Sequence, residues 1–270
     1  MSKKRRPGRR NQQSSIIGYL VIFIVVVVGA LAVDGRHYST SNKGSLLEEA
    51  SSVVRSVTQG ANPANTGTTT AKGTQQLAKL NYSGKQTVLV NENQPTFTKA
   101  QLSMSHGAWA HYGDLDSLNR VTGASAMLNR SLMPTAKREP LYVNPTGWHN
   151  RKIRYKGETT WLYNRSHLLG YQLTGQNNNL KNLMTGTQSL NSPGMEIYEN
   201  KIASYLRETT DNVRYEVTPV FRGTELLARG VHMQAESLRT RSIRFNIYIF
   251  NIQPGANIDY QTGRAKQAAS

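Results

Sequence analysis

The chain contains no cysteine, and this absence excludes several kinds of function. A disulfide framework, a thiolate zinc site and a catalytic cysteine all need that side chain. Acidic residues are also scarce, because 16 Asp and Glu stand against 33 Lys and Arg among 270 residues. No internal repeat is present. The sequence therefore indicates neither a disulfide-stabilised scaffold nor a thiol enzyme.

The excess of positive charge predicts a polyanionic partner, which could be nucleic acid, anionic lipid or an anionic wall polymer. The formal net charge is +17. Without the six Lys and Arg of residues 3–10, it is still +11. The basic N-terminal cluster therefore explains only about a third of the excess.

An almost unbroken apolar run covers residues 16–33 and follows a basic tail at residues 1–15. At a rise of ~1.5 Å per residue, a helix of this length spans about 27 Å, enough for a bilayer core. Lys and Arg are enriched before the run, which predicts a cytoplasmic N-terminus and an extracellular remainder. We expect a single-pass membrane anchor. The alternative is secretion after cleavage following Ala32, because residues 30–32 form an A-x-A pattern.

The remaining chain divides by composition into a spacer, a domain and a short end. Residues 34–75 are rich in Ser, Thr, Gly and Asn and predict a flexible linker. We expect the folded domain over residues 76–264 and a tail at 265–270. Within the domain, hydrophobic patterns predict strands and helical segments. The strands are expected at 86–90, 96–97, 158–164, 214–221, 226–233 and 244–252, and the helical segments at 125–129 and 195–209. These elements predict an α+β domain with an antiparallel sheet.

The most informative stretch is residues 161–201, WLYNRSHLLGYQLTGQNNNLKNLMTGTQSLNSPGMEIYENK. It places one histidine at the end of a predicted strand, an asparagine before a predicted helix and a glutamate on that helix. A one-metal phosphodiesterase needs a base near the scissile phosphate, a divalent ion on its oxygens and a carboxylate that holds the ion's water shell. The sequence supplies one residue for each of these tasks.

This order of motifs resembles the ββα-metal core of the DNA/RNA non-specific endonuclease family, and most closely its DNA-entry nuclease branch. NRSHLLGYQLTG, KNLMTGT, a following Asn and a YEN helix carry the resemblance, and NPTGW upstream and GVHMQA downstream extend it over most of the domain. The sequence departs from the family's commonest Asp-Arg-Gly-His form, with Asn164 for Asp and Ser166 for Gly. The resemblance implies a ββα-metal nuclease fold with a central antiparallel sheet, preceded here by the transmembrane segment.

The resemblance also implies a role for each site residue. His167 would be the general base, and Arg165 would contact phosphate. Asn191 would be the metal ligand, although its place before a helix is also typical of an N-cap. Glu199 would hydrogen-bond water on the metal, and Asn182 would support the site. The competing residue for the Glu199 role is Glu196, one turn earlier. The other histidines carry no functional expectation; they are His37, His106, His111, His149 and His232.

The implied activity is hydrolysis of DNA, and also of RNA, to 5′-phosphate products with Mg²⁺, or with Mn²⁺ as an alternative ion. No small-molecule cofactor is implied, and the oligomeric state stays open. Two other interpretations remain. One is a catalytically inactive surface protein that binds nucleic acid for DNA uptake. The other is an anchored protein whose charge binds wall polymers or lipid.

The apolar run at 16–33 predicts that nuclease activity fractionates with the cell membrane and acts on nucleic acid added outside the cell. Fractionation of cells and medium, followed by N-terminal sequencing of the active species, tests this. Activity found entirely in the medium, with a mature N-terminus at Val33, would show secretion instead.

Overall fold

The computed structural model describes residues 67–69 and 73–268. Their elements are ordered as follows: β1 (Gly67–Thr69), α3 (Thr74–Leu77), β2 (Thr87–Val90), η1 (Asn91–Asn93), β3 (Trp109–Tyr112), β4 (Ala124–Leu128), η2 (Arg130–Leu132), β5 (Lys152–Tyr155), β6 (Glu158–Trp161), β7 (Tyr163–His167), α4 (Tyr171–Thr174), η3 (Leu180–Asn182), β8 (Leu183–Thr187), η4 (Leu190–Met195), α5 (Glu196–Glu208), β9 (Val213–Val220), β10 (Gly230–Ser237), β11 (Arg244–Phe250), β12 (Ala256–Ile258) and β13 (Ala265–Gln267). The fold is α+β, as predicted.

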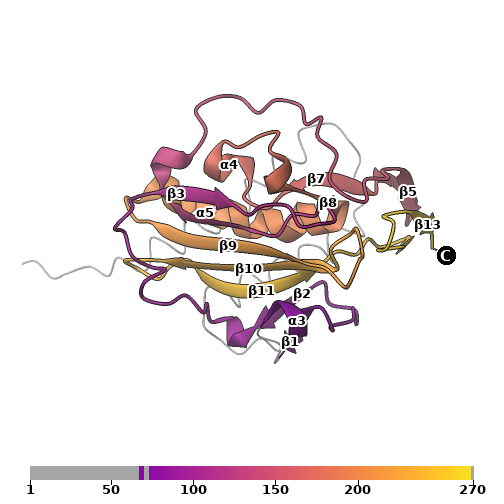
Figure 1. The fold of residues 1–270 in the computed structure, drawn as a ribbon, viewed down its shortest axis with the longest axis horizontal. Helices are drawn as coiled ribbons and strands as arrows, with labels where there is room; N and C mark the ends of the chain where they lie inside the picture. Colours follow the sequence, from indigo (N-terminus) through magenta and orange to yellow (C-terminus); the bar gives the residue numbers. More distant parts are fainter. Residues whose placement is uncertain (1–66, 70–72, 269–270) are drawn as a thin grey trace, which may run out of the picture. The chain divides into compact units, whose positions relative to one another are not determined.

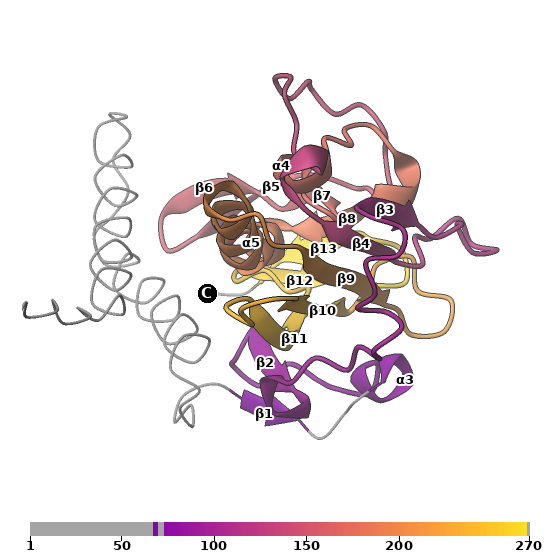
Figure 2. The same ribbon diagram turned by 90° about the vertical axis from the view of Figure 1, so that its left-hand side faces the viewer.

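The centre of the fold is a seven-stranded sheet in the order β1-β2-β11-β10-β9-β4-β3. Every pair in it is antiparallel except β1 with β2. Three two-stranded hairpins lie outside it, namely β5–β6, β7–β8 and β12–β13. Figures 1 and 2 show α5 along one face of the sheet, with the β7–β8 hairpin and α4 near it.

The core forms where α5 packs on the sheet. Ile202, Ala203 and Leu206 of α5 are fully buried and belong to one apolar cluster with alternate residues of β10, such as Val231 and Met233. Side chains alternate across a strand, so only one face of the sheet contributes to this cluster. Each fully buried aliphatic side chain contributes about 1.5–3 kcal/mol. This packing determines which side of α5 faces inward.

The opposite face of the sheet is mixed. A second apolar cluster, which includes Leu77, Val220 and Tyr248, lies on part of it, and polar side chains of β10 meet the chain that follows β2. Gln234 of β10 accepts hydrogen bonds from Thr96. His232 binds the side chain of Asn246 through Nε2 at 2.6 Å, so this buried histidine has a structural partner. The chain between β2 and β3 therefore serves as a cover and not as the strand predicted at 96–97.

One buried asparagine attaches the β7–β8 hairpin to the central sheet. Asn251, just after β11, accepts a hydrogen bond from the Thr187 backbone N–H at 2.8 Å. Its amide nitrogen donates to the carbonyl oxygens of Thr185 and Ala228 at 3.2 and 3.0 Å. The β7–β8 hairpin, whose first strand ends at His167, is thus fixed to the central sheet without being part of it.

Several predicted elements match the structure, and others do not. The helix predicted at 195–209 is confirmed as α5, and the strands at 214–221 and 244–252 correspond to β9 and β11. The helix predicted at 125–129 is wrong, because Ala124–Leu128 pairs with β9 and β3 as strand β4.

The sheets also extend beyond residues 76–264. Strand β1 pairs with β2, and β13 pairs with β12. None of the helices among residues 73–268 is long and apolar enough to cross a membrane. The anchor predicted at 16–33 lies outside the described residues.

The contacts of Asn251 predict a large loss of stability in Asn251→Ala. The free energy of unfolding should fall by about 2–4 kcal/mol, because a buried N–H and two carbonyl oxygens lose their partner. Urea unfolding followed by circular dichroism measures this. The matched control is Asn257→Ala at an exposed position of β12, where we expect a change below about 0.5 kcal/mol. Equal effects of the two substitutions would contradict the role given to Asn251.

Candidate active site

His167 lies at the end of β7 with 6% of its surface exposed. Its Nε2 lies 2.8 Å from the carbonyl oxygen of Asn177. A carbonyl oxygen only accepts hydrogen bonds, so Nε2 carries the proton. Nδ1 then holds the lone pair, and a guanidinium nitrogen of Arg138 lies 3.5 Å from it. Nδ1 is therefore the ring nitrogen that can accept a proton from water.

The charge state of His167 follows from its surroundings. Burial lowers the pKa of His167 to about 4, and the positive charge of Arg138 acts in the same direction. The hydrogen bond with Asn177 raises the pKa and partly opposes burial. In the free protein the ring is therefore neutral at physiological pH, as a general base must be.

Asn182 holds the backbone just after His167. This fully buried side chain accepts a hydrogen bond from the N–H of Leu169 at 2.9 Å and donates one to the carbonyl of Leu169 at 3.0 Å. Both polar ends of the amide are used, so the side chain has one orientation. The position matches the supporting role expected from the sequence.

Glu199 reaches the same backbone segment from α5. Its Oε1 accepts a hydrogen bond from the N–H of Gly170 at 2.8 Å. A Cβ atom added to Gly170 would lie 2.3 Å from Oε2, so this close approach requires glycine. Glu199 lies in the first turn of α5, because this helix begins at Glu196 and not at Asn191.

Glu199 is a buried carboxylate with 9% of its surface exposed and, within residues 73–268, no salt bridge. Burial raises its pKa to about 8; Glu196 adds to this, whereas the hydrogen bond from Gly170 and the charge of Arg138 oppose it. Glu196 itself is exposed and binds the hydroxyl of Ser192. Of the two carboxylates, Glu199 is the one in contact with the loop after His167.

Asn191 lies in η4, the turn of π-helical type that precedes α5. The N-cap of α5 is Met195, so the interpretation of Asn191 as the cap is wrong. Within residues 73–268, the side-chain amide of Asn191 forms no hydrogen bond. The amide oxygen is therefore free to bind another group.

These residues meet at one pocket of about 790 Å³. His167, Arg165, Asn191 and Glu199 all line it, and Asn182 lies behind it. Sequence reasoning therefore placed four residues on one surface, although 34 positions separate the first from the last.

Arg165 is fixed in the wall of this pocket. Its Nε donates to the carbonyl of Val143 and its second amino group to Asn144 Oδ1, both at 2.7 Å. The guanidinium also lies over the ring of Trp148, 4.4 Å from the ring centroid. An arginine held in this way presents its charge at a constant position.

Arg138 is the pocket residue that sequence reasoning missed. It belongs to the long loop between η2 and β5, lines the pocket and contacts His167. The loop has no periodicity, and Arg138 lies 29 positions before the histidine. The only local signal is the basic pair of Lys137 and Arg138, which is typical of any solvated loop.

The two departures from the family's commonest motif have local compensation. Asn164 donates a hydrogen bond to Gln188 Oε1 across the hairpin. The Ser166 hydroxyl is buried without a hydrogen-bond partner among the described residues, and a Cβ at Gly186 would lie 2.3 Å from it. Gly186 therefore leaves the space that Ser166 fills.

The donor set fits a hard divalent ion. No three His, Asp or Glu residues in the described part of the chain gather as a cluster that could hold a metal. Asn191 offers a free amide oxygen, and Glu199 is a carboxyl group whose pKa is raised by burial. Mg²⁺ keeps several waters and needs few protein ligands, all of them oxygen.

A family model described as DNA/RNA non-specific endonuclease matches residues 101–238, about half of the chain. A protein named deoxyribonuclease from Streptococcus dysgalactiae subsp. equisimilis is 29% identical over an alignment of 194 residues that covers 56% of this chain. The matched region spans only 59% of that protein's length.

Two solved structures have the same fold. NucA from Streptococcus agalactiae with magnesium ion bound matches with a TM-score of 0.58 and 24% identity, over 66% of this chain and 86% of that one. The Sda1 nuclease with bound zinc ion matches with a TM-score of 0.52 and 26% identity, over 60% and 82%.

The buried environment of His167 predicts that its ring titrates near pH 4 in the metal-free protein. The unfolded chain takes up this proton near the usual pKa of 6.5. The unfolded state therefore binds more protons between about pH 6.5 and 4, and the free energy of unfolding falls as the pH drops through this window. NMR titration of the ring resonances, with urea unfolding at each pH, measures both effects.

The matched variant is His167→Gln, which should lose less stability than the wild type over the same pH range. A ring that titrates near pH 6.5 would show that the imidazole is solvated and would contradict its burial.

Proposed function

Because the chain belongs to the DNA/RNA non-specific endonuclease family, we propose that it hydrolyses phosphodiester bonds in DNA and RNA, with His167 as the general base. The observation that carries this proposal is the single pocket that His167, Asn191 and Glu199 line together. A base, an amide oxygen and a carboxylate are the groups that metal-assisted attack of water on a phosphodiester needs.

His167 accepts the proton of the attacking water at Nδ1. The hydrogen bond from Nε2–H to Asn177 keeps the ring in the tautomer that leaves Nδ1 free. In the free protein Arg138 lies beside Nδ1. A bound phosphate attracts this guanidinium and brings negative charge near the ring. Both changes raise the proton affinity of His167 when substrate is present.

Asn191 and Glu199 are the residues that would hold the divalent ion, Asn191 through its amide oxygen and Glu199 through its carboxyl group. When bound, the ion supplies positive charge against the phosphorane-like transition state. Glu199, whose pKa burial raises, would ionise beside such a positive charge. We favour Mg²⁺, with Mn²⁺ as the alternative, because the donors are oxygens and the solved relatives carry magnesium or zinc.

Arg165 and Arg138 contact the phosphate. Both present guanidinium groups at the pocket, and Arg165 is fixed by the backbone and by Trp148. Contacts to phosphate identify no base, so cleavage is independent of sequence. Attack in line with the leaving 3′ oxygen gives products with 5′-phosphates. The name of the deoxyribonuclease relative supports DNA as a substrate, and the family description supports RNA.

We place this domain outside the cell, held by the segment at 16–33. The apolar run and the basic residues before it support this location. The rival proposal, an inactive surface protein that binds DNA for uptake, requires the loss of at least one catalytic group. It is disfavoured, because His167, Asn191 and Glu199 all lie at the pocket.

The proposed roles predict different defects in two variants. His167→Ala should lower the rate of plasmid cleavage by ~10²–10⁴-fold while Mg²⁺ binding stays nearly unchanged, because the ring acts on water and not on the ion. Asn191→Ala should instead shift activity to higher Mg²⁺. Cleavage rates over a Mg²⁺ series, with calorimetric measurement of Mg²⁺ binding, separate the two defects.

The controls use EDTA and an added base. EDTA should abolish cleavage by the wild type, and imidazole in solution should restore part of the activity of His167→Ala but none of Asn191→Ala. Wild-type binding of DNA without any metal-dependent cleavage would support the uptake protein. A metal-affinity defect in His167→Ala, with a mere stability loss in Asn191→Ala, would show that the histidine is the ligand.

A further inference from the structure

The β5–β6 hairpin presents two different faces. Its register places Lys152 opposite Trp161 and Arg154 opposite Thr159. Because side chains alternate along a strand, these four residues share one face, and all four are exposed. Ile153 points to the other face, where it is buried with Leu162, Tyr163 and Leu227. We refer to Lys152, Arg154, Thr159 and Trp161 as the hairpin face.

Trp161 is unusually exposed for a tryptophan, with 53% of its surface accessible. The ammonium group of Lys152 lies over its ring, 5.5 Å from the centroid. This contact fixes one face of the indole ring, while much of the ring surface remains exposed to solvent. An exposed aromatic ring that is held in place by a neighbouring cation is typical of a binding surface.

The hairpin face is continuous with the candidate active site. Trp161 lines the same pocket as His167 and Asn191, and it lies only six positions before the histidine in the chain. A nucleic-acid strand whose scissile phosphate lies at His167 must leave the pocket along one of the pocket walls. One of these walls is the indole ring of Trp161.

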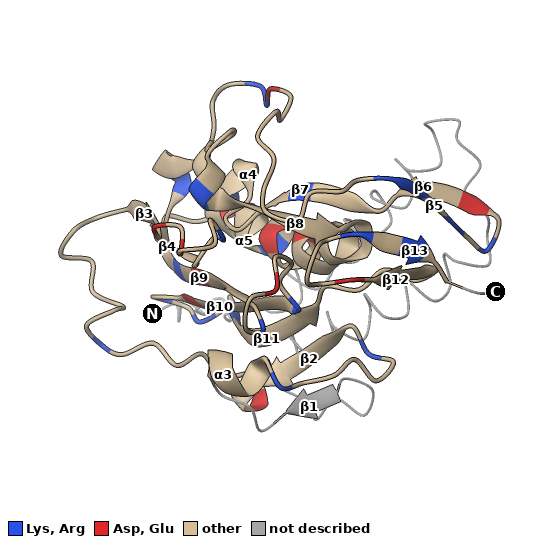
Figure 3. Cartoon of the chain, turned by 45° about the vertical axis from the view of Figure 1, so that its right-hand side comes forward, with Lys and Arg blue, Asp and Glu red and all other residues tan. Residues whose placement is uncertain are grey.

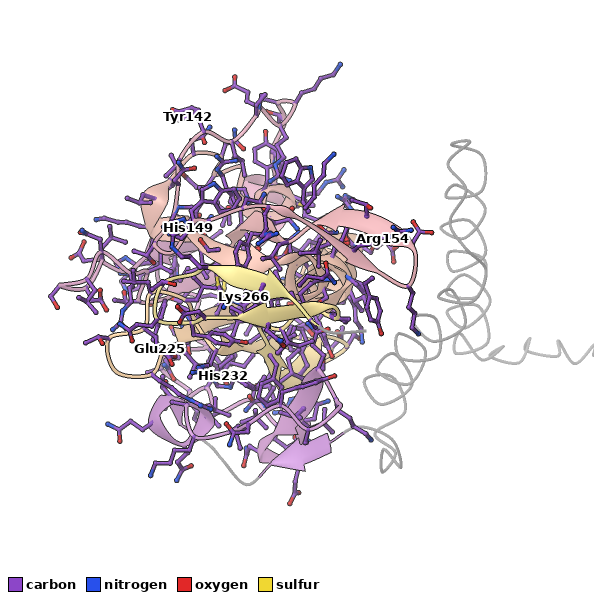
Figure 4. All side chains as sticks on the ribbon, turned by 90° about the vertical axis from the view of Figure 1, so that its right-hand side faces the viewer. Tyr142, His149, Arg154, Glu225, His232 and Lys266 are labelled. Carbon is purple, nitrogen blue, oxygen red and sulfur yellow. The ribbon has the colours of Figure 1, made fainter. Side chains whose placement is uncertain are left out.

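The charge of the hairpin suits a nucleic-acid backbone. Arg151, Lys152, Arg154 and Lys156 are basic, and Glu158 is the one acidic residue between positions 151 and 161. Figure 3 shows this concentration of Lys and Arg along β5–β6 and the neighbouring β13. Figure 4 shows Arg154 on the projecting hairpin. A basic surface interleaved with an exposed aromatic ring is the arrangement with which proteins bind single strands.

We propose that the hairpin face binds an unpaired nucleotide of the substrate strand next to the scissile phosphate, a specificity that rests on the nuclease function proposed above. The base stacks on Trp161, and Lys152 and Arg154 contact the phosphates that follow. A base within a duplex is already stacked and paired, and must leave the helix before it can reach the indole. The hairpin face therefore favours single-stranded or locally opened nucleic acid.

Tyr142 does not serve this purpose, although 76% of its surface is exposed. It lies on the loop before β5, has no cation over its ring and does not line the pocket. Among the aromatic residues that the structure describes, Trp161 alone combines exposure, an adjacent cation and a place in the pocket wall.

Binding is measured by fluorescence anisotropy with the full-length chain in EDTA, so that no cleavage occurs. The probes are a labelled single-stranded oligonucleotide, the duplex of the same sequence and single strands that carry one abasic site at successive positions. The variants are Trp161→Ala and Trp161→Phe. The matched control is Lys79→Gln, an exposed lysine just after α3 that does not line the pocket.

Trp161→Ala should weaken single-strand binding by roughly 5- to 100-fold, which is the range for loss of one stacked base. Duplex binding should weaken by less than about 3-fold, and Trp161→Phe should retain most of the affinity. In the wild type, one abasic position should weaken binding, and this sensitivity should vanish in Trp161→Ala. Lys79→Gln should bind as the wild type does.

Equal losses for single strand and duplex would overturn the proposal, as would no loss, or abasic sensitivity that persists in Trp161→Ala. Because the assay contains no metal, its outcome is independent of cleavage. A wild type that cleaves no nucleic acid with Mg²⁺ would refute the proposed function, whereas active variants with unchanged strand preference would refute only the role of the hairpin face. Thermal unfolding of each variant identifies any loss of fold.

Discussion

The hydrogen bond from the Gly170 N–H to the Glu199 carboxylate determines how the site is assembled. It connects two parts of the fold that have separate supports. The segment after His167 is held by Asn182 and by a hairpin outside the central sheet, whereas α5 is held by its apolar packing on that sheet. The contact exists only because the residue at 170 has no side chain. The Glu199 side chain bridges the two parts, so the position of its carboxyl group relative to His167 depends on the core packing of α5 and on this hydrogen bond.

Burial shifts the two ionisable groups of the site in opposite directions, and both shifts favour the neutral form. His167 resists protonation, and Glu199 resists ionisation. A pocket of this kind can hold a neutral base and a neutral acid until an anionic phosphate and a cation enter together. Each ligand then stabilises the charged form of one group. In the proposed function, substrate and metal binding would therefore be coupled to the charge states of His167 and Glu199 by electrostatics.

The sequence predicted those parts of the site whose signal is local. His167, Asn182, Asn191 and Glu199 fall within one continuous motif, and the apolar periodicity of α5 is clear over 13 residues. Strand β4 was misassigned because a five-residue apolar segment fits either period, and only its pairing with β9 decides. Arg138 could not be found, since a loop without periodicity carries it to the pocket. The sequence also did not predict that Asn191 lies in a π-type turn before the start of α5, because this turn is defined only in the folded chain.

Ser166 and Gly186 occupy neighbouring strands of the hairpin and share a single small volume. The hydroxymethyl group at 166 takes the space that a side chain at 186 would need. A larger side chain at 186 therefore requires a smaller residue at 166. The segment that carries His167 is thus shaped by its partner strand as well as by its own residues.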